Sequence, residues 1–176
     1  MKALIVVDYQ NDFVTGSLGF ENAKKLEGPI CKKIESYLAD DGLVLFTKDV
    51  HDSNTYPNTL EGKHLPVDHC TTDEGSAIYG KVARYSNPEN TILKDRFGSE
   101  DLCARLKQYD NIEQFELCGL VSSICVLSNA VLIRANFPNI PIVIDAICVG
   151  AADESMNSKA LDVMENLQME VINRSE

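Results

Sequence analysis

Six short apolar runs alternate with helical patterns along the chain, and most of these runs are rich in β-branched residues. The runs occupy residues 3–7, 43–47, 91–93, 114–118, 141–145 and 170–172, and the helical patterns occupy residues 27–39, 99–108, 123–135 and 154–166. Parallel strands need a long connection, usually a helix, so this alternation predicts a parallel sheet with helices on both faces. We therefore expect an α/β fold: one three-layer α/β/α domain over residues 1–176, Rossmann-like, with a six-stranded and mainly parallel sheet.

The cysteines give no sign of a disulfide framework, because the six of them show no C-x-x-C pair and no regular spacing. A chain of 176 residues with 44% hydrophobic content can bury a core without disulfides, so we expect free thiols in a reducing compartment. Four cysteines fit the apolar faces of strands or helices, where we expect core positions: Cys31, Cys103, Cys118 and Cys148. The N-terminal residues enter a strand without an apolar segment long enough for a signal peptide or a membrane span, which predicts a cytoplasmic protein.

The chain is acidic, with 27 Asp and Glu residues against 16 Lys and Arg residues and a net charge of −11. This charge and a pI near 4.7 argue against binding to a nucleic-acid backbone or to an anionic membrane. We expect a small-molecule ligand that is neutral, or that meets local positive groups. The sequence leaves the oligomeric state open, a homo-oligomer included.

The segment from Cys118 to Val126 ends an apolar strand and opens an amphipathic helix. It places Cys125 in the first turn of the predicted helix, where unpaired backbone N–H groups carry partial positive charge. Such a position lowers the pKa of a thiol, so we expect Cys125 to be a nucleophile. The same turn directs backbone N–H groups towards one point, which suits a developing oxyanion. A buried structural role is the alternative for a cysteine taken alone.

Asp8, Asp49 and Lys94 each stand at or just after the C-terminal end of another predicted strand. Parallel α/β sheets bind ligands beyond the carboxyl ends of their strands, so we expect these side chains to share one crevice with Cys125. An activated thiol needs a base and a group that orients or tunes that base, and Asp8 and Lys94 supply these types. Taken singly, Asp8 could cap a turn and Lys94 could belong to a surface charge cluster.

The stretch from residue 49 to residue 83 carries all three histidines and little periodicity. Loops of that length inside a compact domain are usually functional or disordered. Asp49 and His51 form an Asp-x-His motif after the second strand, and His69 follows later. Carboxylate and imidazole suit zinc, iron or manganese, and three protein ligands leave coordination positions open. Histidines that are merely solvated in a loop are the alternative.

Three motifs, in order, resemble the isochorismatase-like cysteine hydrolases and, among them, the nicotinamidase-like members. They are Val7-Asp-Tyr-Gln-Asn-Asp-Phe13, Thr91-Ile-Leu-Lys94 and Cys118-Gly-Leu-Val-Ser-Ser-Ile-Cys125. The resemblance covers essentially the whole chain and implies a catalytic triad of Asp8, Lys94 and Cys125. It also implies an oxyanion hole made by the backbone N–H groups of Val121 and Cys125, and a cis peptide bond between Leu120 and Val121.

The resemblance further implies a metal site with three or four protein ligands: Asp49, His51, His69 and, as the acidic residue that some members add, Glu61. Zinc is the first expectation for the metal, and iron and manganese are the alternatives. Two departures from the commoner family pattern fall in this region. No tryptophan stands near the second histidine, and one extra residue separates Pro66 from His69. His64 therefore competes for a ligand position.

The activity implied by the resemblance is that of an amidase acting on a small carboxamide, with nicotinamide as the leading substrate and nicotinate and ammonia as products. Phe13, Phe97 and Tyr85 are candidate walls for a flat aromatic substrate, although aromatic residues beside strand ends also occur as core. Other family amidases, which act on carbamoyl, ureido or maleamic-type substrates, are the main alternative. A vinyl-ether hydrolase is a less favoured alternative, because that activity resembles family members that lack the cysteine. A non-catalytic receiver-like module is also disfavoured, because it would need paired acidic residues at the end of the first strand, where Val6 and Val7 precede Asp8.

Overall fold

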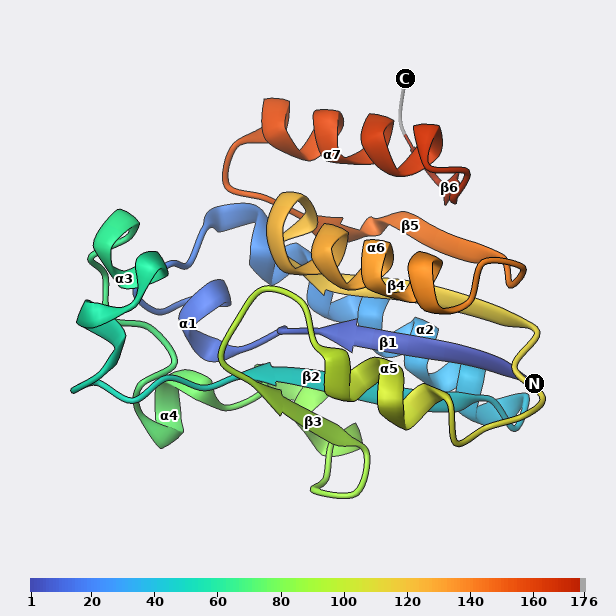
Figure 1. Ribbon diagram of the computed structural model, residues 1–176, viewed down its shortest axis with the longest axis horizontal. Coiled ribbons are helices and arrows are strands. Elements are labelled where there is room, and N and C mark those ends of the chain that lie inside the picture. The colour runs from blue at the N-terminus through green and yellow to red at the C-terminus, as the bar shows by residue number, and fades with distance from the viewer. Residues whose placement is uncertain (175–176) are drawn as a thin grey trace.

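A six-stranded parallel sheet forms the centre of the molecule, and the computed structural model describes it with the rest of residues 1–174 (Figure 1). Its strands are β1 Lys2–Val7, β2 Leu43–Asp49, β3 Thr91–Lys94, β4 Gln114–Leu120, β5 Ile142–Gly150 and β6 Glu170–Ile172. The strand order is β3-β2-β1-β4-β5-β6, and every neighbouring pair is parallel. This is the Rossmann strand order, which reverses between β1 and β4. The predicted fold class is confirmed.

Helices cover both faces of this sheet (Figure 1). One face carries α2 Glu27–Ala39, and the other carries α5 Glu100–Leu106, α6 Leu127–Asn136 and α7 Glu154–Asn166. Leu4 and Val6 of β1 join the core on the α2 side, whereas Ile5 and Val7 join the opposite core, because successive strand side chains point to opposite faces. No helix within residues 1–174 is long and apolar enough to cross a membrane.

Short helical turns build the segments that surround the carboxyl ends of the strands. They are α1 Asn11–Val14, η1 Glu21–Leu26, η2 Tyr56–Asn58, α3 Leu60–His64, α4 Asp73–Ser76 and η3 Gly80–Tyr85. Thr59 and Thr72 cap α3 and α4, because their hydroxyl oxygens accept hydrogen bonds from the backbone N–H groups of Gly62 and Gly75. The long stretch after β2 is therefore ordered by local caps, although its sequence shows little periodicity.

The helix after β4 begins later than its apolar pattern predicts. Residues Ser122–Val126 form a π-helical turn, η4, and α6 starts at Leu127 rather than at position 123. The Val126 N–H donates a hydrogen bond of 3.1 Å to the Val121 carbonyl, five residues back, and hydrophobic periodicity does not reveal that register. The Leu120–Val121 peptide bond is cis, as the family resemblance implies.

Strands β1 and β4 approach each other closely at the end of the sheet where the candidate site lies. Gly119 pairs with Val7 and has a φ of +107°, a conformation that L side chains rarely adopt. A Cβ atom at this position would lie 2.0 Å from the Val7 carbonyl oxygen. Glycine is therefore required here for the strand that leads into the turn before Cys125.

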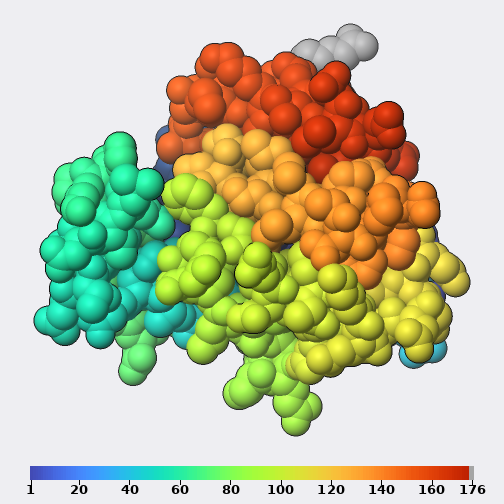
Figure 2. Space-filling model, in the orientation of Figure 1, coloured from blue at the N-terminus to red at the C-terminus, as the bar shows by residue number. Residues whose placement is uncertain are grey.

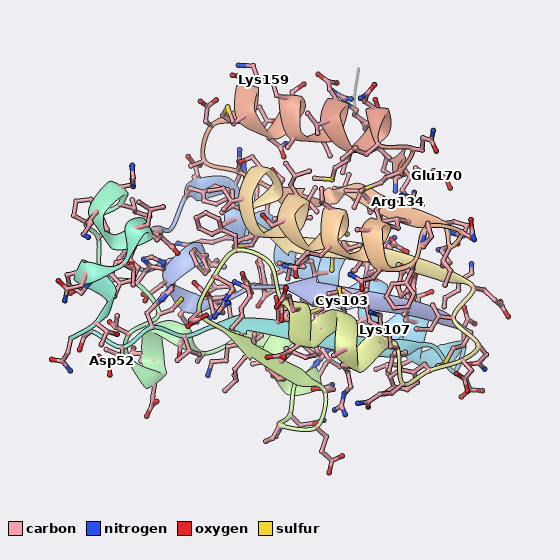
Figure 3. The ribbon with its side chains drawn as sticks, in the orientation of Figure 1. Asp52, Cys103, Lys107, Arg134, Lys159 and Glu170 are labelled. Carbon is pink, nitrogen blue, oxygen red and sulfur yellow. The ribbon has the colours of Figure 1, made fainter. Side chains whose placement is uncertain are left out.

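All six cysteines are unpaired and buried, which confirms the predicted free thiols and the four predicted core positions. Cys103, labelled on α5 in Figure 3, belongs to the core on the α5, α6 and α7 side of the sheet. The same view labels Arg134 on α6, whose guanidinium donates a 2.7 Å hydrogen bond to the Gln168 carbonyl. That bond ties α6 to the connection between α7 and β6.

Candidate active site

Four buried polar side chains meet beyond the carboxyl ends of the strands. Lys94 Nζ lies 2.6 Å from Asp8 Oδ2 and 3.0 Å from Asp49 Oδ1. The same nitrogen lies 3.7 Å from Cys125 Sγ. The predicted convergence of these residues is confirmed. It occurs beside the β1–β4 pair, where the strand order reverses and α/β folds bind their ligands.

Asp8 is fully buried and is held through both carboxylate oxygens. The Thr47 hydroxyl donates a 2.6 Å hydrogen bond to Asp8 Oδ1, while Oδ2 faces Lys94. Burial raises the pKa of Asp8 above its ordinary value, and the Lys94 cation opposes that rise. A carboxyl group held in this balance is able both to accept a proton and to give it back.

Lys94 carries a positive charge in spite of its burial. Burial alone lowers the pKa of the ammonium group, but Asp8, Cys125 and Asp49 together raise the net pKa of Lys94 above its ordinary value. One cation is thus shared by two carboxylates and lies next to the thiol. This arrangement fits the predicted role of Lys94 in orienting and tuning Asp8.

The prediction that the helix start lowers the pKa of the Cys125 thiol is wrong. Cys125 lies inside η4 and is buried, and burial raises its pKa well above the ordinary value, with the Asp8 carboxylate adding to the rise. Lys94 lowers the pKa but does not outweigh burial. Burial therefore favours the protonated form of this sulfur, and the Asp8 carboxyl is one of the charged groups around it.

A cluster of metal-ligand type adjoins Asp8, Lys94 and Cys125. One ligand atom from each of Asp49, His51 and His69 lies within 4.8 Å of the other two, and all three residues are buried. His51 Nε2 lies 2.9 Å from Asp49 Oδ2. His69 Nδ1 lies 2.9 Å from the Val67 carbonyl, to which it donates, and this leaves Nε2 as the nitrogen with a free lone pair. The donor set fits a divalent transition metal.

The structure separates the two competitors for a further ligand position. Glu61 Oε1 lies 3.5 Å from His69 Nε2, so this carboxylate borders the cluster. His64 is exposed at the end of α3, and its Nδ1 lies 2.8 Å from the Leu60 carbonyl, one helical turn back. His64 therefore lies outside the cluster of Asp49, His51 and His69, and Glu61 is the better candidate.

Gln10 is a site residue to which sequence reasoning assigned no role. Its buried side-chain amide donates to the Asp49 and Ser76 carbonyls at 2.8 Å each and accepts from the Asp49 N–H at 2.8 Å. It thereby joins the metal-cluster residue Asp49 to α4. Its position two residues after Asp8, at the end of a strand, was the only sequence feature that pointed to the site. Its hydrogen-bond partners come from segments distant in the sequence, so its role could not be predicted.

Asn129 is a second such residue, one turn after Cys125 on α6. Its Nδ2 donates to the Cys125 carbonyl at 2.8 Å and to the Phe97 carbonyl at 3.2 Å. Its Oδ1 accepts from the Ser99 N–H at 3.0 Å. One buried amide therefore fixes the nucleophile turn relative to the loop between β3 and α5.

We expect Asn129→Asp to lower the free energy of unfolding by about 1–3 kcal/mol, because the amide donor is lost and a carboxylate then faces two carbonyl oxygens. Urea unfolding of the purified variant measures this loss. The control is Asn139→Asp, at an exposed position in the turn after the same helix, where we expect a change within about 0.5 kcal/mol. Equal losses in the two variants would contradict the account.

One cavity, of about 620 Å³, reaches Cys125 and two residues of the metal-ligand cluster, whereas Asp8, Lys94 and His51 do not line it. Cys125, Val121, Asp49, Glu61 and His69 line it, and so do two of the three predicted aromatic walls, Phe13 and Phe97. In Figure 2 the teal residues around α3 stand apart from the green and orange body, with blue N-terminal residues visible in the hollow between them. The substrate-binding role of Phe13 and Phe97 stays a prediction.

Tyr85 does not line this cavity, so its prediction as a substrate wall is wrong. Its hydroxyl donates to a Glu35 carboxylate oxygen on α2, away from the triad. Its place in η3, after a loop of weak periodicity, could not be read from the sequence. Of the three predicted aromatic walls, Phe13 and Phe97 line the cavity, and Tyr85 does not.

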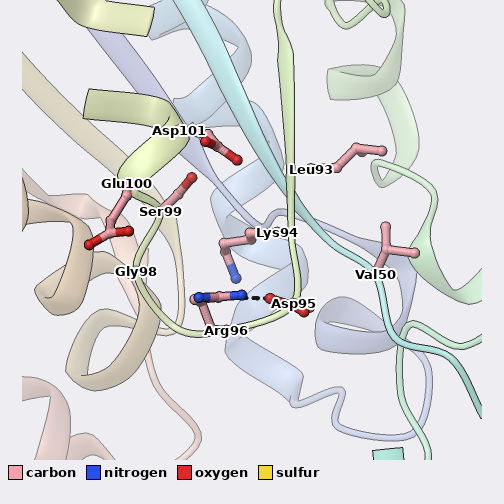
Figure 4. A pocket seen from close by; sticks show the side chains of 9 residues that line it. All are labelled: Val50, Leu93, Lys94, Asp95, Arg96, Gly98, Ser99, Glu100 and Asp101. Atoms are coloured by element: carbon pink, nitrogen blue, oxygen red, sulfur yellow. Dashed lines mark hydrogen bonds and ion pairs between the residues drawn. The ribbon is translucent and has the colours of Figure 1, made fainter. Parts of the chain in front are cut away.

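A second cavity, of about 480 Å³, lies beside the loop between β3 and α5 (Figure 4). Lys94 borders it, but the remaining charged lining is dominated by the carboxylates of Asp95, Glu100 and Asp101. Arg96 is drawn there in contact with Asp95, at 2.8 Å. The lining contains neither Cys125 nor a histidine, so this cavity lacks the candidate nucleophile and the candidate imidazole ligands.

The isochorismatase domain family matches residues 2–176, and the chain belongs to this family. A curated Bacillus subtilis protein, described as the uncharacterized isochorismatase family protein PncA, is 28% identical over 144 residues, which cover 74% of this chain and 76% of that protein. The crystal structure of nicotinamidase PncA from Bacillus subtilis is 28% identical, with a TM-score of 0.83, and the match covers 97% of this chain and 98% of that chain.

A pyrazinamidase of Pyrococcus horikoshii, solved in complex with zinc, shares the fold at lower identity. It is 19% identical with a TM-score of 0.81, and the match covers 98% of this chain and 99% of that chain. These likenesses agree with the family resemblance read from the three motifs around Asp8, Lys94 and Cys125.

Proposed function

We propose that this chain is a cysteine-dependent amidohydrolase that converts nicotinamide and water to nicotinate and ammonia. The observation that carries the proposal is the buried contact of Lys94 with Asp8, Cys125 and Asp49. Through Lys94, the Asp8 and Cys125 side chains needed for thiol chemistry are connected to Asp49, a member of the metal-ligand cluster. Membership of the isochorismatase family and the likeness to a nicotinamidase structure support this reading.

In the proposed reaction Asp8 accepts the proton of the Cys125 thiol, and the sulfur attacks the amide carbonyl carbon. The backbone N–H groups of Val121 and Cys125 stabilise the oxyanion. The carbon–nitrogen bond then breaks, Asp8 returns the proton to the departing ammonia, and a thioester remains on Cys125. Water, activated by Asp8, cleaves the thioester and releases the carboxylic acid, and Lys94 orients Asp8 throughout.

Asp49, His51 and His69, with Glu61 beside them, would hold a divalent transition metal, with zinc as the first choice and iron or manganese as alternatives. When bound, the metal would supply a Lewis acid able to accept a ring nitrogen of the substrate. The contribution of this chain is to fix that site relative to the thiol, through the contacts of Lys94 with Asp49 and Cys125.

Ammonia release from a panel of purified amides tests the proposed function. The panel contains nicotinamide, an aliphatic amide, and the carbamoyl, ureido and maleamic-type substrates of the sister amidases. We expect the highest kcat/KM for nicotinamide within this panel. Preference for a carbamoyl or maleamic compound would instead assign the chain to a sister activity, and release from none of them would contradict the amidase reading.

We expect Lys94→Ala to lower kcat/KM by about 100-fold, because loss of the cation disturbs the acid–base group. Removing the cation also raises the pKa of Asp8 further. The ionised carboxylate is the form that accepts the thiol proton, so the acidic limb of the pH–rate profile should move to higher pH. Lys107→Ala, at an exposed position, is the control. An unmoved limb with near-normal turnover would place Lys94 outside the mechanism.

We expect the purified protein to contain about one divalent transition-metal ion per chain. His51→Ala should lose the ion, whereas His64→Ala should keep it, and elemental analysis of the two variants measures this difference. Chelation should raise KM for nicotinamide far more than for an aliphatic amide, which has no ring nitrogen. Equal metal content in the two variants would remove His51 from the site.

A further inference from the structure

The cavity above Cys125 is larger than a single-ring amide needs. It measures about 620 Å³, whereas a cavity of about 150 Å³ already holds a benzene ring. Its size falls in the range of about 300–1,000 Å³ that is typical of sites for larger ligands. A metal and one aromatic amide at the floor would leave a substantial outer part of the cavity for other substrate atoms.

Polar and apolar groups are unequally distributed between the floor and the mouth. The floor holds the buried residues Asp49, His69 and Cys125, with the buried ring of Phe13. The mouth holds exposed apolar side chains from three different segments: Leu60 on α3, Phe97 in the loop after β3, and Ile124 in η4. Their exposed fractions are 74%, 45% and 41%. Apolar side chains gathered at the opening of a site are a sign of binding.

The charged groups near the mouth favour a neutral ligand part over an anionic one. Arg96, the only arginine that lines the cavity in the described part of the chain, is paired with Asp95 at 2.8 Å. The carboxylate of Glu61 lies deeper, against His69. An alkyl or aryl group at the mouth would contact Leu60, Phe97 and Ile124, whereas the Asp95 carboxylate beside Arg96 would oppose an anionic substituent.

We propose that the preferred substrates are aromatic primary carboxamides that carry a neutral apolar substituent of several carbon atoms, bound at the mouth by Leu60, Phe97 and Ile124. This inference rests on the proposed amidase function and narrows its substrate class. The amide lies over Cys125, and the substituent points outward past α3. Since one added methylene in an apolar site changes specificity by about 10-fold or more, a propyl group should have a measurable effect.

The test compares kcat/KM for nicotinamide with kcat/KM for nicotinamides that bear a propyl group, or a carboxyethyl group of similar size, on the ring. We expect at least one propyl compound to exceed nicotinamide by about 10-fold or more, and the carboxyethyl compounds to fall below it. Leu60→Asp should reduce the preference for the propyl compound several-fold. Leu38→Asp, at an exposed position on α2, is the matched control and should leave the ratio unchanged.

The outcomes separate the inference from the proposed function. Turnover of nicotinamide with no gain for any propyl compound, or a ratio unaffected by Leu60→Asp, would overturn the inference alone. Ammonia release from none of the amides would overturn the proposed function and the inference with it. If Leu60→Asp instead converts an oligomer into a monomer in sedimentation without changing the ratio, the mouth is an interface between copies and the inference is wrong.

Discussion

Replacing Cys125 with alanine should lower kcat by about 10⁴-fold or more, because no other group is placed to form the thioester. The change removes one sulfur atom from a buried site, so we expect the fold to persist. Ammonia release from nicotinamide measures the activity, and urea unfolding checks the fold.

The matched control is Cys118→Ala. Cys118 is equally buried, but its thiol lies in the core on the α2 side of the sheet and contacts the Ile5 carbonyl at 3.8 Å. We expect this variant to keep most of its activity. An inactive Cys118 variant beside an active Cys125 variant would overturn the nucleophile assignment.

Asp8→Asn should be the next most damaging change, with a loss of about 10³–10⁴-fold in kcat. An amide cannot accept the thiol proton, and in this site the thiol needs that acceptor because burial raises the pKa of Cys125. Asp95→Asn is the control, since Asp95 is exposed and lies next to Lys94 in the sequence. An active Asp8→Asn variant would require a different base.

The fold and the meeting of Asp8, Asp49 and Lys94 could be predicted from the sequence because both follow from the strand pattern. A strand such as β1, buried on both faces, appears as a continuous apolar run, and the carboxyl ends of parallel strands lie along one edge. Asp8, Asp49 and Lys94 each stand at or directly after such a run. Their convergence is thus a geometric consequence of a parallel sheet.

Features that depend on tertiary contacts could not be predicted in the same way. The position of Cys125 at a helix start was visible, but its burial was not, and burial determines the direction of its pKa shift. The partners of Gln10 and Asn129 come from distant segments, so neither role has a local signal. Hydrophobic periodicity likewise gives no register for a π-helical turn such as η4.

In the metal-ligand cluster, too, one part could be predicted from a local motif and another part depended on how the loop folds. The Asp49-x-His51 motif follows a strand and was visible in the sequence. The choice between Glu61 and His64 depended on α3, which turns Glu61 towards His69 and leaves His64 exposed. Glu61 and His64 are only three residues apart, and the sequence pattern does not show which of them faces His69. That depends on the helix that begins after the Thr59 cap.

The most direct test of the central claim is peptide mapping by mass spectrometry after rapid acid quenching of the first turnover with nicotinamide. The account predicts a nicotinoyl group on the peptide that contains Cys125, formed and then lost as nicotinate appears. In Asp8→Asn this adduct should form much more slowly. A nicotinoyl group on any other residue, or ammonia release with no adduct at any time point, would contradict a thioester mechanism at Cys125.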